Sequence, residues 1–405
     1  HFVRIINGHF YRMSSNPRVF LAIDNCFASK RWTEPKEWMS IIKDLGIHYV
    51  EASADNESDP LYSTGEYLRK WVDEIHNLSV ETGVNVCNLY SGHGTYATLG
   101  LAHTDESVRD HIQNDWLKKM VDNAALLNAG LGFYCHAFDN KTLQENDLYV
   151  NAYKDLIERL AVISSYANQA NLTSIGIEQM YTPHQIPWTV KGASDMMKSI
   201  YKISNHPFYI TIDVGHQSGQ RRFLRPGIEM FRLSLEKPEE IPEFWVGSDK
   251  AYRLFEEAKN ATEDRRDEIL DEIQNDIDSN PHLYASYDDG DPCYWIEKLG
   301  CFSPIIHLQQ TDGTHSSHLP FIDEHNEKGI ITGEEVLEKL YSAYQQKPEA
   351  GMPPKCREIF LTIEVFSSTT DIPFDILKNL EKSVEYWRKF VPEDGIKLSK
   401  LIEKL

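Results

Sequence analysis

The sequence predicts an α/β fold, a closed (β/α)8 TIM barrel with a helical insertion between strands six and seven. Short apolar segments, typical of buried parallel strands, alternate with longer amphipathic segments, typical of helices, along the 405-residue chain. This alternation repeats eight times, which favours a closed barrel. The rival doubly wound sheet normally carries a glycine-rich phosphate loop after its first strand, but AIDNCFAS at 22–29 contains no glycine.

The strand segments follow one another with helical segments between them. The first, RVFLAID, is an apolar run that ends in an acid, and the sixth, FYITIDVGH, has the same character. Among the helical segments, 107–130 is expected to end at Gly130, because glycine is common just after a helix. The expected strands are, in chain order, 18–24, 48–53, 84–93, 130–138, 173–180, 208–216, 303–313 and 358–368.

One connection is much longer than the others. Strand six ends near 213 and strand seven begins near 303, and most of the excess lies in 227–290, which has the pattern of helices with an acidic face. We therefore expect one barrel domain over 1–405 with a helical insertion at 227–290, rising on the side of the active site. A lid, a dimer contact and a spacer all remain possible roles for the insertion.

Composition indicates a soluble, folded protein of the cytoplasm. Hydrophobic residues make up 41% of the chain, and the net charge of -21 disfavours binding to nucleic acid or to an anionic membrane. None of the six cysteines forms a Cys-x-x-Cys pair, and no stretch of 18 apolar residues occurs.

Four expected strands end in residues that can ligate a metal. Three of them finish with an apolar, any, apolar, acid pattern that places Glu178, Asp213 and Glu364, and a fourth ends in His307. A single acid at a strand end is more often a helix cap or an ion-pair partner. In a barrel, however, all four would meet at the carboxyl mouth, where buried carboxylates repel one another unless a positive charge compensates. We expect a divalent metal there, with manganese first and cobalt, magnesium or zinc as alternatives.

This strand-end pattern resembles that of the xylose isomerase-like TIM-barrel superfamily, which contains sugar and sugar-phosphate isomerases and epimerases. In its epimerase-type members, strands five to eight supply Glu, Asp, His and Glu as metal ligands, and these positions match Glu178, Asp213, His307 and Glu364. The resemblance also implies that His216, in the Asp-x-x-His pattern, contacts substrate. It further implies a sugar or sugar-phosphate substrate and a homo-oligomer.

The ligand set suggests a reaction type. A metal that binds two adjacent oxygens of a ketose or aldose polarises the carbonyl and acidifies the neighbouring C–H group. Glu178 and Glu364 are expected on opposite sides of the sugar, where they would transfer a proton through an enediolate. Return of the proton to the next carbon gives isomerisation and return to the opposite face gives epimerisation, and both remain open.

Further polar residues near the expected mouth are candidates for substrate binding. An arginine in SGQRRFLRPG suits a phosphate or carboxylate, although pairing with the acidic insertion is the alternative. An indole after strand five can pack on the C–H face of a sugar, or can serve as a local plug. The candidates besides His216 are His93, His136, His184, Trp188, Arg222 and His318.

Two other functions remain as alternatives. In trinuclear-zinc apurinic endonucleases, which share this barrel, additional histidines bind metal, and His93, His136, Asp323 and His325 loosely match those positions. The acidic net charge argues against such a DNA enzyme. The third possibility is a metal-binding barrel without catalysis.

Overall fold

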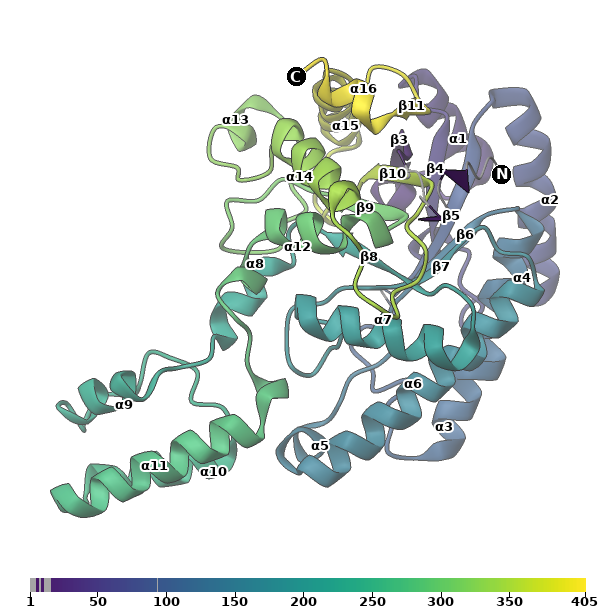
Figure 1. The fold of residues 1–405 in the computed structure, drawn as a ribbon. Coiled ribbons are helices and arrows are strands. Elements are labelled where there is room, and N and C mark those ends of the chain that lie inside the picture. The colour runs from purple at the N-terminus through teal and green to yellow at the C-terminus, as the bar shows by residue number, and fades with distance from the viewer. Residues whose placement is uncertain (1–4, 7–8, 11–15, 93) are drawn as a thin grey trace.

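The centre of the molecule is a closed barrel of eight parallel strands (Figure 1). The computed structural model describes residues 5–6, 9–10, 16–92 and 94–405. Neighbouring strands pair in chain order, and β10 pairs with β3 to close the barrel, which confirms the predicted (β/α)8 fold. The barrel strands are β3 (Arg18–Asp24), β4 (Tyr49–Ser53), β5 (Asn85–Ser91), β6 (Gly130–Phe133), β7 (Ile175–Glu178), β8 (Tyr209–Asp213), β9 (Ile305–Leu308) and β10 (Glu358–Ile363).

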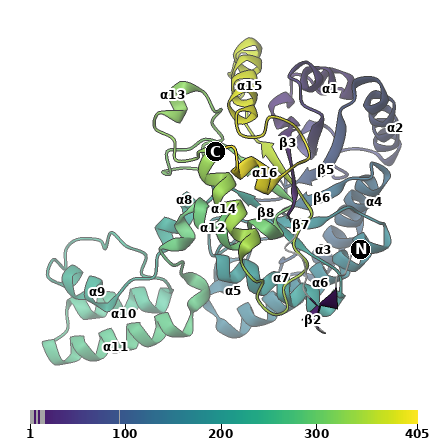
Figure 2. The same ribbon diagram turned by 45° about the horizontal axis from the view of Figure 1, so that its top comes forward.

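Helices surround the barrel and cover its outer surface (Figure 2). In the described residues, three further short strands lie outside the barrel, namely β1 (Ile5–Ile6), β2 (His9–Phe10) and β11 (Ile396–Lys397), the last antiparallel to β3. The helices around the barrel are α1 (Pro35–Asp44), α2 (Gly65–Thr82), α3 (Glu106–His111), α4 (Lys118–Leu126), α5 (Asn140–Gln144), α6 (Asn146–Gln169), α7 (Val190–Ser204), α8 (Gln217–Gln220), α12 (Pro292–Leu299), α13 (Asp323–Asn326), α14 (Gly333–Gln345), α15 (Pro373–Arg388) and α16 (Leu398–Ile402).

The end of the helical segment before β6 differs from the expectation. The α4 helix stops at Leu126, and Asn128, with φ of 55°, takes the left-handed conformation at the turn. Gly130 is instead the first residue of β6, so its expected role as a helix terminus was wrong. A Cβ at Gly130 would lie 2.6 Å from Oδ1 of Asn88, so glycine here leaves room for an inward-facing polar side chain.

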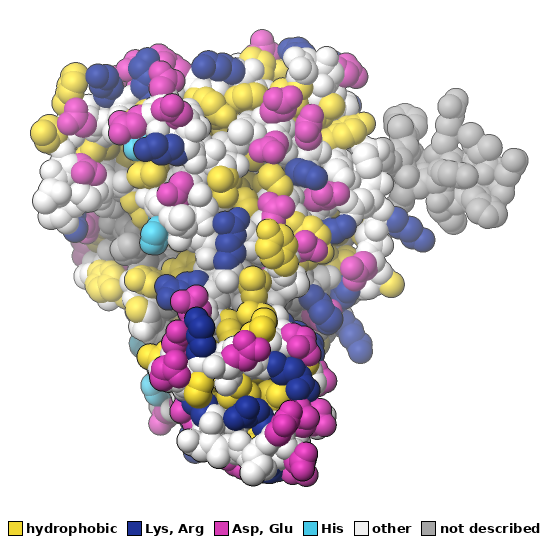
Figure 3. Space-filling view, turned by 90° about the vertical axis from the view of Figure 1, so that its left-hand side faces the viewer, with side chains coloured by type: hydrophobic (Ala, Val, Ile, Leu, Met, Phe, Trp, Pro, Cys, Tyr) yellow, Lys and Arg dark blue, Asp and Glu magenta, His cyan; other side chains and the backbone are white. Residues whose placement is uncertain are grey.

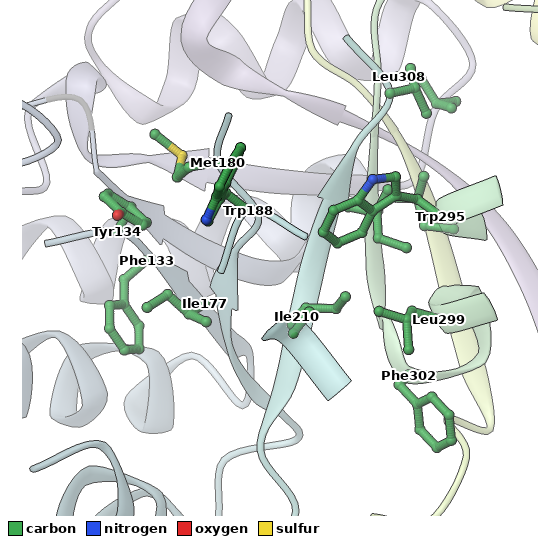
Figure 4. Packing of buried hydrophobic residues seen from close by; sticks show 14 of the residues in the cluster. Phe133, Tyr134, Ile177, Met180, Trp188, Ile210, Trp295, Leu299, Phe302 and Leu308 are labelled. Carbon is green, nitrogen blue, oxygen red and sulfur yellow. The ribbon is translucent and has the colours of Figure 1, made fainter. Parts of the chain in front are cut away.

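Two apolar layers hold the strands in place. Ile177 and Ile210 both face outward, Ile177 beside Phe133 of β6 and Ile210 on the side of Trp295 and Leu299 of α12 (Figure 4). Inside the barrel at its amino end, Phe20 stacks on Phe360 with ring centroids 4.8 Å apart, and Tyr49 packs edge-on against Phe20. Aromatic rings therefore fill the barrel below the level at which the polar residues occur.

The long connection between β8 and β9 forms a helical arm. Its helices α9 (Ile228–Leu235), α10 (Asp249–Lys259) and α11 (Glu263–Ser279) pack together and project from the side of the barrel (Figures 1 and 2). Acidic, basic and hydrophobic side chains are interspersed over the face of the arm in Figure 3. At its base the ring of His282 stacks on Tyr149 of α6, with centroids 3.9 Å apart.

The helices named above and all six cysteines lie among the described residues. None of the helices in residues 16–92 and 94–405 is both long and apolar enough to cross a membrane. No disulfide joins the six cysteines.

Candidate metal centre

Side-chain alternation along the strands brings the polar residues into the barrel. Residues two apart on a strand face the same side, so on β8 Thr211 and Asp213 point inward while Ile210 and Ile212 face the helices. The pairing of Asp213 with His307 places these two side chains next to each other on β8 and β9. The carboxyl end of the barrel is therefore lined by acids and an imidazole.

The four residues predicted as metal ligands come together at this end. One ligand atom from each of Glu178, Asp213, His307 and Glu364 lies within 4.8 Å of the other three, and all four residues are buried. Nδ1 of His307 is 3.1 Å from Oε1 of Glu178 and 3.3 Å from Oε2 of Glu364. Three carboxylates and one imidazole thus face a common point.

The charges in this group are strongly unbalanced. Burial raises the pKa of the Glu364 carboxyl, and the neighbouring Asp213 and Glu178 carboxylates raise it further, so that it lies well above its ordinary value despite nearby His307. Burial alone would lower the pKa of His307, but Glu364 and Glu51 outweigh it and raise that pKa well above its usual range. The cluster therefore binds protons strongly when no cation is present.

The pKa of Asp213 is shifted in the opposite direction, because imidazoles and hydrogen-bond donors surround its carboxylate. Burial raises its pKa, but the imidazoles of His216, His318 and His307 outweigh this effect and bring the pKa down to about 2. Its Oδ1 accepts the Gly215 N–H at 2.6 Å, and the Gln309 amide donates to both carboxylate oxygens at 2.8 and 3.0 Å. Asp213 is thus held as a carboxylate in a fixed orientation.

A second group of polar residues lies beneath the four ligands. Glu51 of β4 is fully buried, and its Oε1 accepts a hydrogen bond from Nε2 of His307 at 2.6 Å. Asn88 of β5 donates to its other oxygen at 2.6 Å. Asp24, paired with Glu51 across β3 and β4, is also buried, and burial followed by the Glu51 and Glu364 charges raises its pKa well above the usual value.

Sequence reasoning missed Asp24, Glu51 and Asn88. Asp24 ends LAID, the same apolar, any, apolar, acid pattern that identified the other strand-end acids, so a signal for it was present. Glu51 and Asn88 lie inside strands, where nothing in the local sequence distinguishes an inward-facing polar residue from a surface one.

The donor set fits a divalent cation. Oxygen ligands from three carboxylates with one imidazole nitrogen are typical of manganese, magnesium, cobalt or zinc sites. Within the described chain, Oε2 of Glu364 is buried and accepts no hydrogen bond, although it lies 3.3 Å from Nδ1 of His307. A buried carboxylate oxygen without a donor is costly unless a cation or a proton compensates for it.

A cavity of about 170 Å³ opens directly above this group. Both Glu178 and Glu364 line it, so the carboxylates can reach a molecule bound there. Its lining residues are Ser53, Tyr90, Gly92, Tyr96, Glu178, Met180, Tyr181, His216, His318, Glu364 and Phe366, and this set contains no residue of the arm.

The structure places two of the predicted substrate residues in the cavity wall. Nδ1 of His216 donates to the carbonyl oxygen of Gln179 at 2.6 Å, and its Nε2 lies 3.5 Å from Asp213. His318 has a positive φ of 45°, and its ring lies 4.1 Å from that of Phe366. Its Nδ1 is 3.4 Å from Oε2 of Glu364.

The other predicted substrate residues lie elsewhere. His136 is fully buried, its Nε2 is 2.6 Å from the Ile186 carbonyl oxygen, and burial lowers its pKa to about 4. Trp188 is buried against Phe223, and His184 is exposed with its Nδ1 2.8 Å from the Phe138 carbonyl oxygen. These three and the exposed Arg222 are absent from the cavity lining, and His93 lies outside the described residues.

Positions assigned to a multi-zinc site are likewise separate from the centre. The candidate metal groups found in the described residues include neither His136, nor Asp323, nor His325. Nδ1 of His325 instead lies 3.1 Å from the Pro320 carbonyl oxygen.

Comparisons with known proteins agree with this architecture. The family model described as the xylose isomerase-like TIM barrel matches residues 39–249, more than half of the chain. No curated protein matches the sequence.

Three solved structures share the fold. A Rhodospirillum rubrum protein described as a candidate xylose isomerase aligns with a TM-score of 0.66 at 16% identity, over 92% of this chain and 99% of its own. L-Ribulose 3-epimerase aligns with a TM-score of 0.52 at 12% identity, over 95% and 96% of the two chains. D-Psicose 3-epimerase of Clostridium cellulolyticum, solved with D-tagatose, aligns with a TM-score of 0.50 at 11% identity, over 92% and 98%. With its closed barrel and the match of the family model, this chain belongs to the xylose isomerase-like TIM-barrel family.

Proposed function

We propose that the protein is a divalent-metal-dependent isomerase or epimerase of an unphosphorylated ketose or aldose. The observation that carries this proposal is the position of Glu178 and Glu364, which both line the cavity and both belong to the candidate metal group. Glu178, Asp213, His307 and Glu364 would hold the cation, with manganese our first choice. A bound cation supplies polarisation of the substrate carbonyl and so acidifies the neighbouring C–H group.

Glu178 and Glu364 are the proposed proton-transferring residues. Glu178 ends β7 and Glu364 directly follows β10, with β8 and β9 between them, so they reach the cavity from different directions. The Tyr90 hydroxyl donates a hydrogen bond to Oε2 of Glu178 and orients that carboxylate. Glu178 and Glu364 both face the cavity, so one carboxylate can remove a proton from the substrate while the other returns it.

The lining of the cavity supports a substrate without a phosphate group. In the described part of the lining there is no lysine or arginine, whereas Tyr96, Tyr181 and Phe366 present aromatic surface. Aromatic faces pack on the C–H groups of a neutral sugar. Arg221, the first arginine after His216 in the sequence, donates instead to the carbonyl oxygens of Gly290 and Gly313. The surrounding carboxylates would also repel a phosphate.

A substrate panel tests this function. Unphosphorylated ketoses and aldoses and their phosphates are incubated with the Mn²⁺-supplemented protein in heavy water, and products and deuterium incorporation are measured. We expect turnover of an unphosphorylated sugar, with deuterium at the carbon next to the carbonyl, because solvent exchange accompanies an enediolate. Turnover of phosphates alone, or product formed without any exchange, would contradict the proposal.

Metal analysis separates this function from the multi-zinc alternative. One ion per chain is expected, at the one four-residue group that the described residues contain, whereas a trinuclear phosphodiesterase site would bind two or three.

A further inference from the structure

The two nitrogens of His307 face different partners. Nδ1 points to the candidate metal group, 3.1 Å from Glu178 and 3.3 Å from Glu364. Nε2 points to the opposite side and donates to Oε1 of Glu51 at 2.6 Å. The orientation of this ring is therefore defined by Glu51 on one side and by the metal group on the other.

Glu51 is itself held in one position. It is fully buried on β4, and its second oxygen accepts the Asn88 side-chain N–H at 2.6 Å. Asn88 has the space to do this because β6 carries Gly132, where a Cβ would lie 3.2 Å from the Asn88 amide nitrogen. Asn88, Glu51 and His307 thus form a hydrogen-bonded chain across three strands.

Glu51 does not contact a molecule in the cavity. It is not among the lining residues, and His307 lies between it and the Glu178 and Glu364 carboxylates. The 2.6 Å between Nε2 of His307 and Oε1 of Glu51 is a hydrogen-bond distance, so these two atoms share a proton in this structure. Its effect on the centre must therefore act through His307.

A neutral imidazole carries one proton and can offer only its other nitrogen to a metal. A carboxylate beside Nε2 keeps the proton on that nitrogen, which leaves the lone pair of Nδ1 directed at the metal. We infer that Glu51, oriented by Asn88, is a positioning residue that fixes the Nε2–H tautomer of His307 and so presents Nδ1 to the cation. This inference rests on the metal centre of the proposed function and assigns it a supporting residue.

The substitution Glu51→Gln tests the inference without a change in side-chain shape. Asn88 donates to one end of the side chain at 51, so the glutamine carbonyl would accept that bond and the glutamine NH2 would face Nε2 of His307. His307 would then have to carry its proton on Nδ1, which blocks metal binding. We expect the affinity for Mn²⁺ to fall about 10- to 100-fold, the usual effect of losing such a partner.

The double variant E51Q/N88D is the matched rescue. The aspartate at 88 would accept the glutamine NH2 and turn the glutamine carbonyl back toward Nε2 of His307. This variant also has the same number of carboxylates as the wild type. Asp276→Asn is the control for loss of any buried carboxylate, because Asp276 is buried in the arm, where it accepts the Ser248 hydroxyl.

Two measurements on the full chain decide the result. Calorimetric titration with Mn²⁺ is expected to show weak binding for E51Q alone, with E51Q/N88D and D276N near the wild type. Long-range proton–nitrogen NMR of the Zn²⁺-loaded protein with labelled histidine, assigned by the loss of one signal in H307Q, is expected to show His307 protonated at Nε2 in the wild type and the rescue.

A failure of the metal centre can be distinguished from a failure of the role assigned to Glu51. If the wild type binds neither ion, the metal centre of the proposed function fails and this inference fails with it. If the wild type and E51Q bind Mn²⁺ equally, or if zinc-loaded wild-type His307 is protonated at Nδ1, only the role of Glu51 is overturned. If E51Q does not fold, the NMR assignment of the protonated nitrogen of His307 in the wild type still tests the inference.

Discussion

Replacing Glu364 with glutamine removes one of the two glutamates that line the cavity while keeping the side chain's shape. In the metal-free protein burial, and then the neighbouring Asp213 and Glu178 carboxylates, raise the pKa of this carboxyl well above its ordinary value, which favours the neutral form. Neutral glutamine resembles that form, and we expect the metal-free variant to unfold at nearly the wild-type temperature.

Catalysis should respond very differently from stability. A positioned acid or base typically contributes a factor of about 10² to 10⁴, which corresponds to about 2.7 to 5.5 kcal/mol of the barrier. Glu364 also belongs to the candidate metal group, so its variant must be assayed under Mn²⁺ concentrations that saturate it. Under those conditions, we expect turnover to fall by at least about 100-fold.

The assay measures two reactions of the same sugar in heavy water, namely exchange of its proton with solvent and conversion to product. With Glu178 intact, E364Q should still exchange the proton of one stereoisomer with solvent but should not complete the conversion. Glu358→Gln is the control on the same strand, since Glu358 pairs with Arg18 at the other end of the barrel. Turnover of E364Q within about threefold of the wild type would refute a proton-transfer role for Glu364.

The pH dependence of stability and one glycine substitution give two further predictions. The folded metal-free protein holds protons on Asp24, Glu364 and His307 above their ordinary pKa values of 3.8, 4.5 and 6.5, so its free energy of unfolding should fall as pH rises through the raised values. Thermal unfolding should show this loss of stability between about pH 6 and about pH 9. Saturating Mn²⁺ should make the loss of stability smaller. Gly215→Ala would place a Cβ 2.3 Å from the Gln309 amide carbon, which should cost about 1 to 3 kcal/mol of stability and weaken Mn²⁺ binding.

Each of these two predictions has an internal check. Asp213, with its pKa lowered to about 2, contributes stability that is lost only as pH falls below its ordinary value of 3.8, so it does not alter the sign at higher pH. A metal-free stability that rises from about pH 6 to about pH 9 would contradict the charge analysis. Gly227→Ala is the control for the glycine, because a Cβ there meets nothing within 4 Å, and equal effects of both substitutions would refute the steric argument.

The barrel could be predicted because the pattern of an apolar strand followed by an amphipathic helix recurs along the chain. Eight apolar strands separated by helices leave few alternatives, and the strand-end acids follow from the rule that parallel strands in a barrel end at one mouth. The sequence therefore suffices to group Glu178, Asp213, His307 and Glu364, and in the structure one ligand atom of each lies within 4.8 Å of the others.

Residues that depend on side-chain direction were harder to predict. Trp188 and His136 follow strands in sequence, yet their rings pack into the wall around the barrel instead of into the cavity. Glu51 lies inside a strand, and its link to His307 spans 256 positions, so no local pattern could indicate it. The histidines of the loop after β9 also differ in side-chain direction. His318 lies beside Glu364, whereas His325 is hydrogen-bonded to the Pro320 carbonyl oxygen.

X-ray diffraction at the manganese absorption edge, from crystals grown with Mn²⁺, tests the centre most directly. We predict one anomalous peak per chain, bonded to Glu178, Asp213, Glu364 and Nδ1 of His307. A map without a peak at that point under saturating Mn²⁺, or with the ion bound by other residues, would contradict the account.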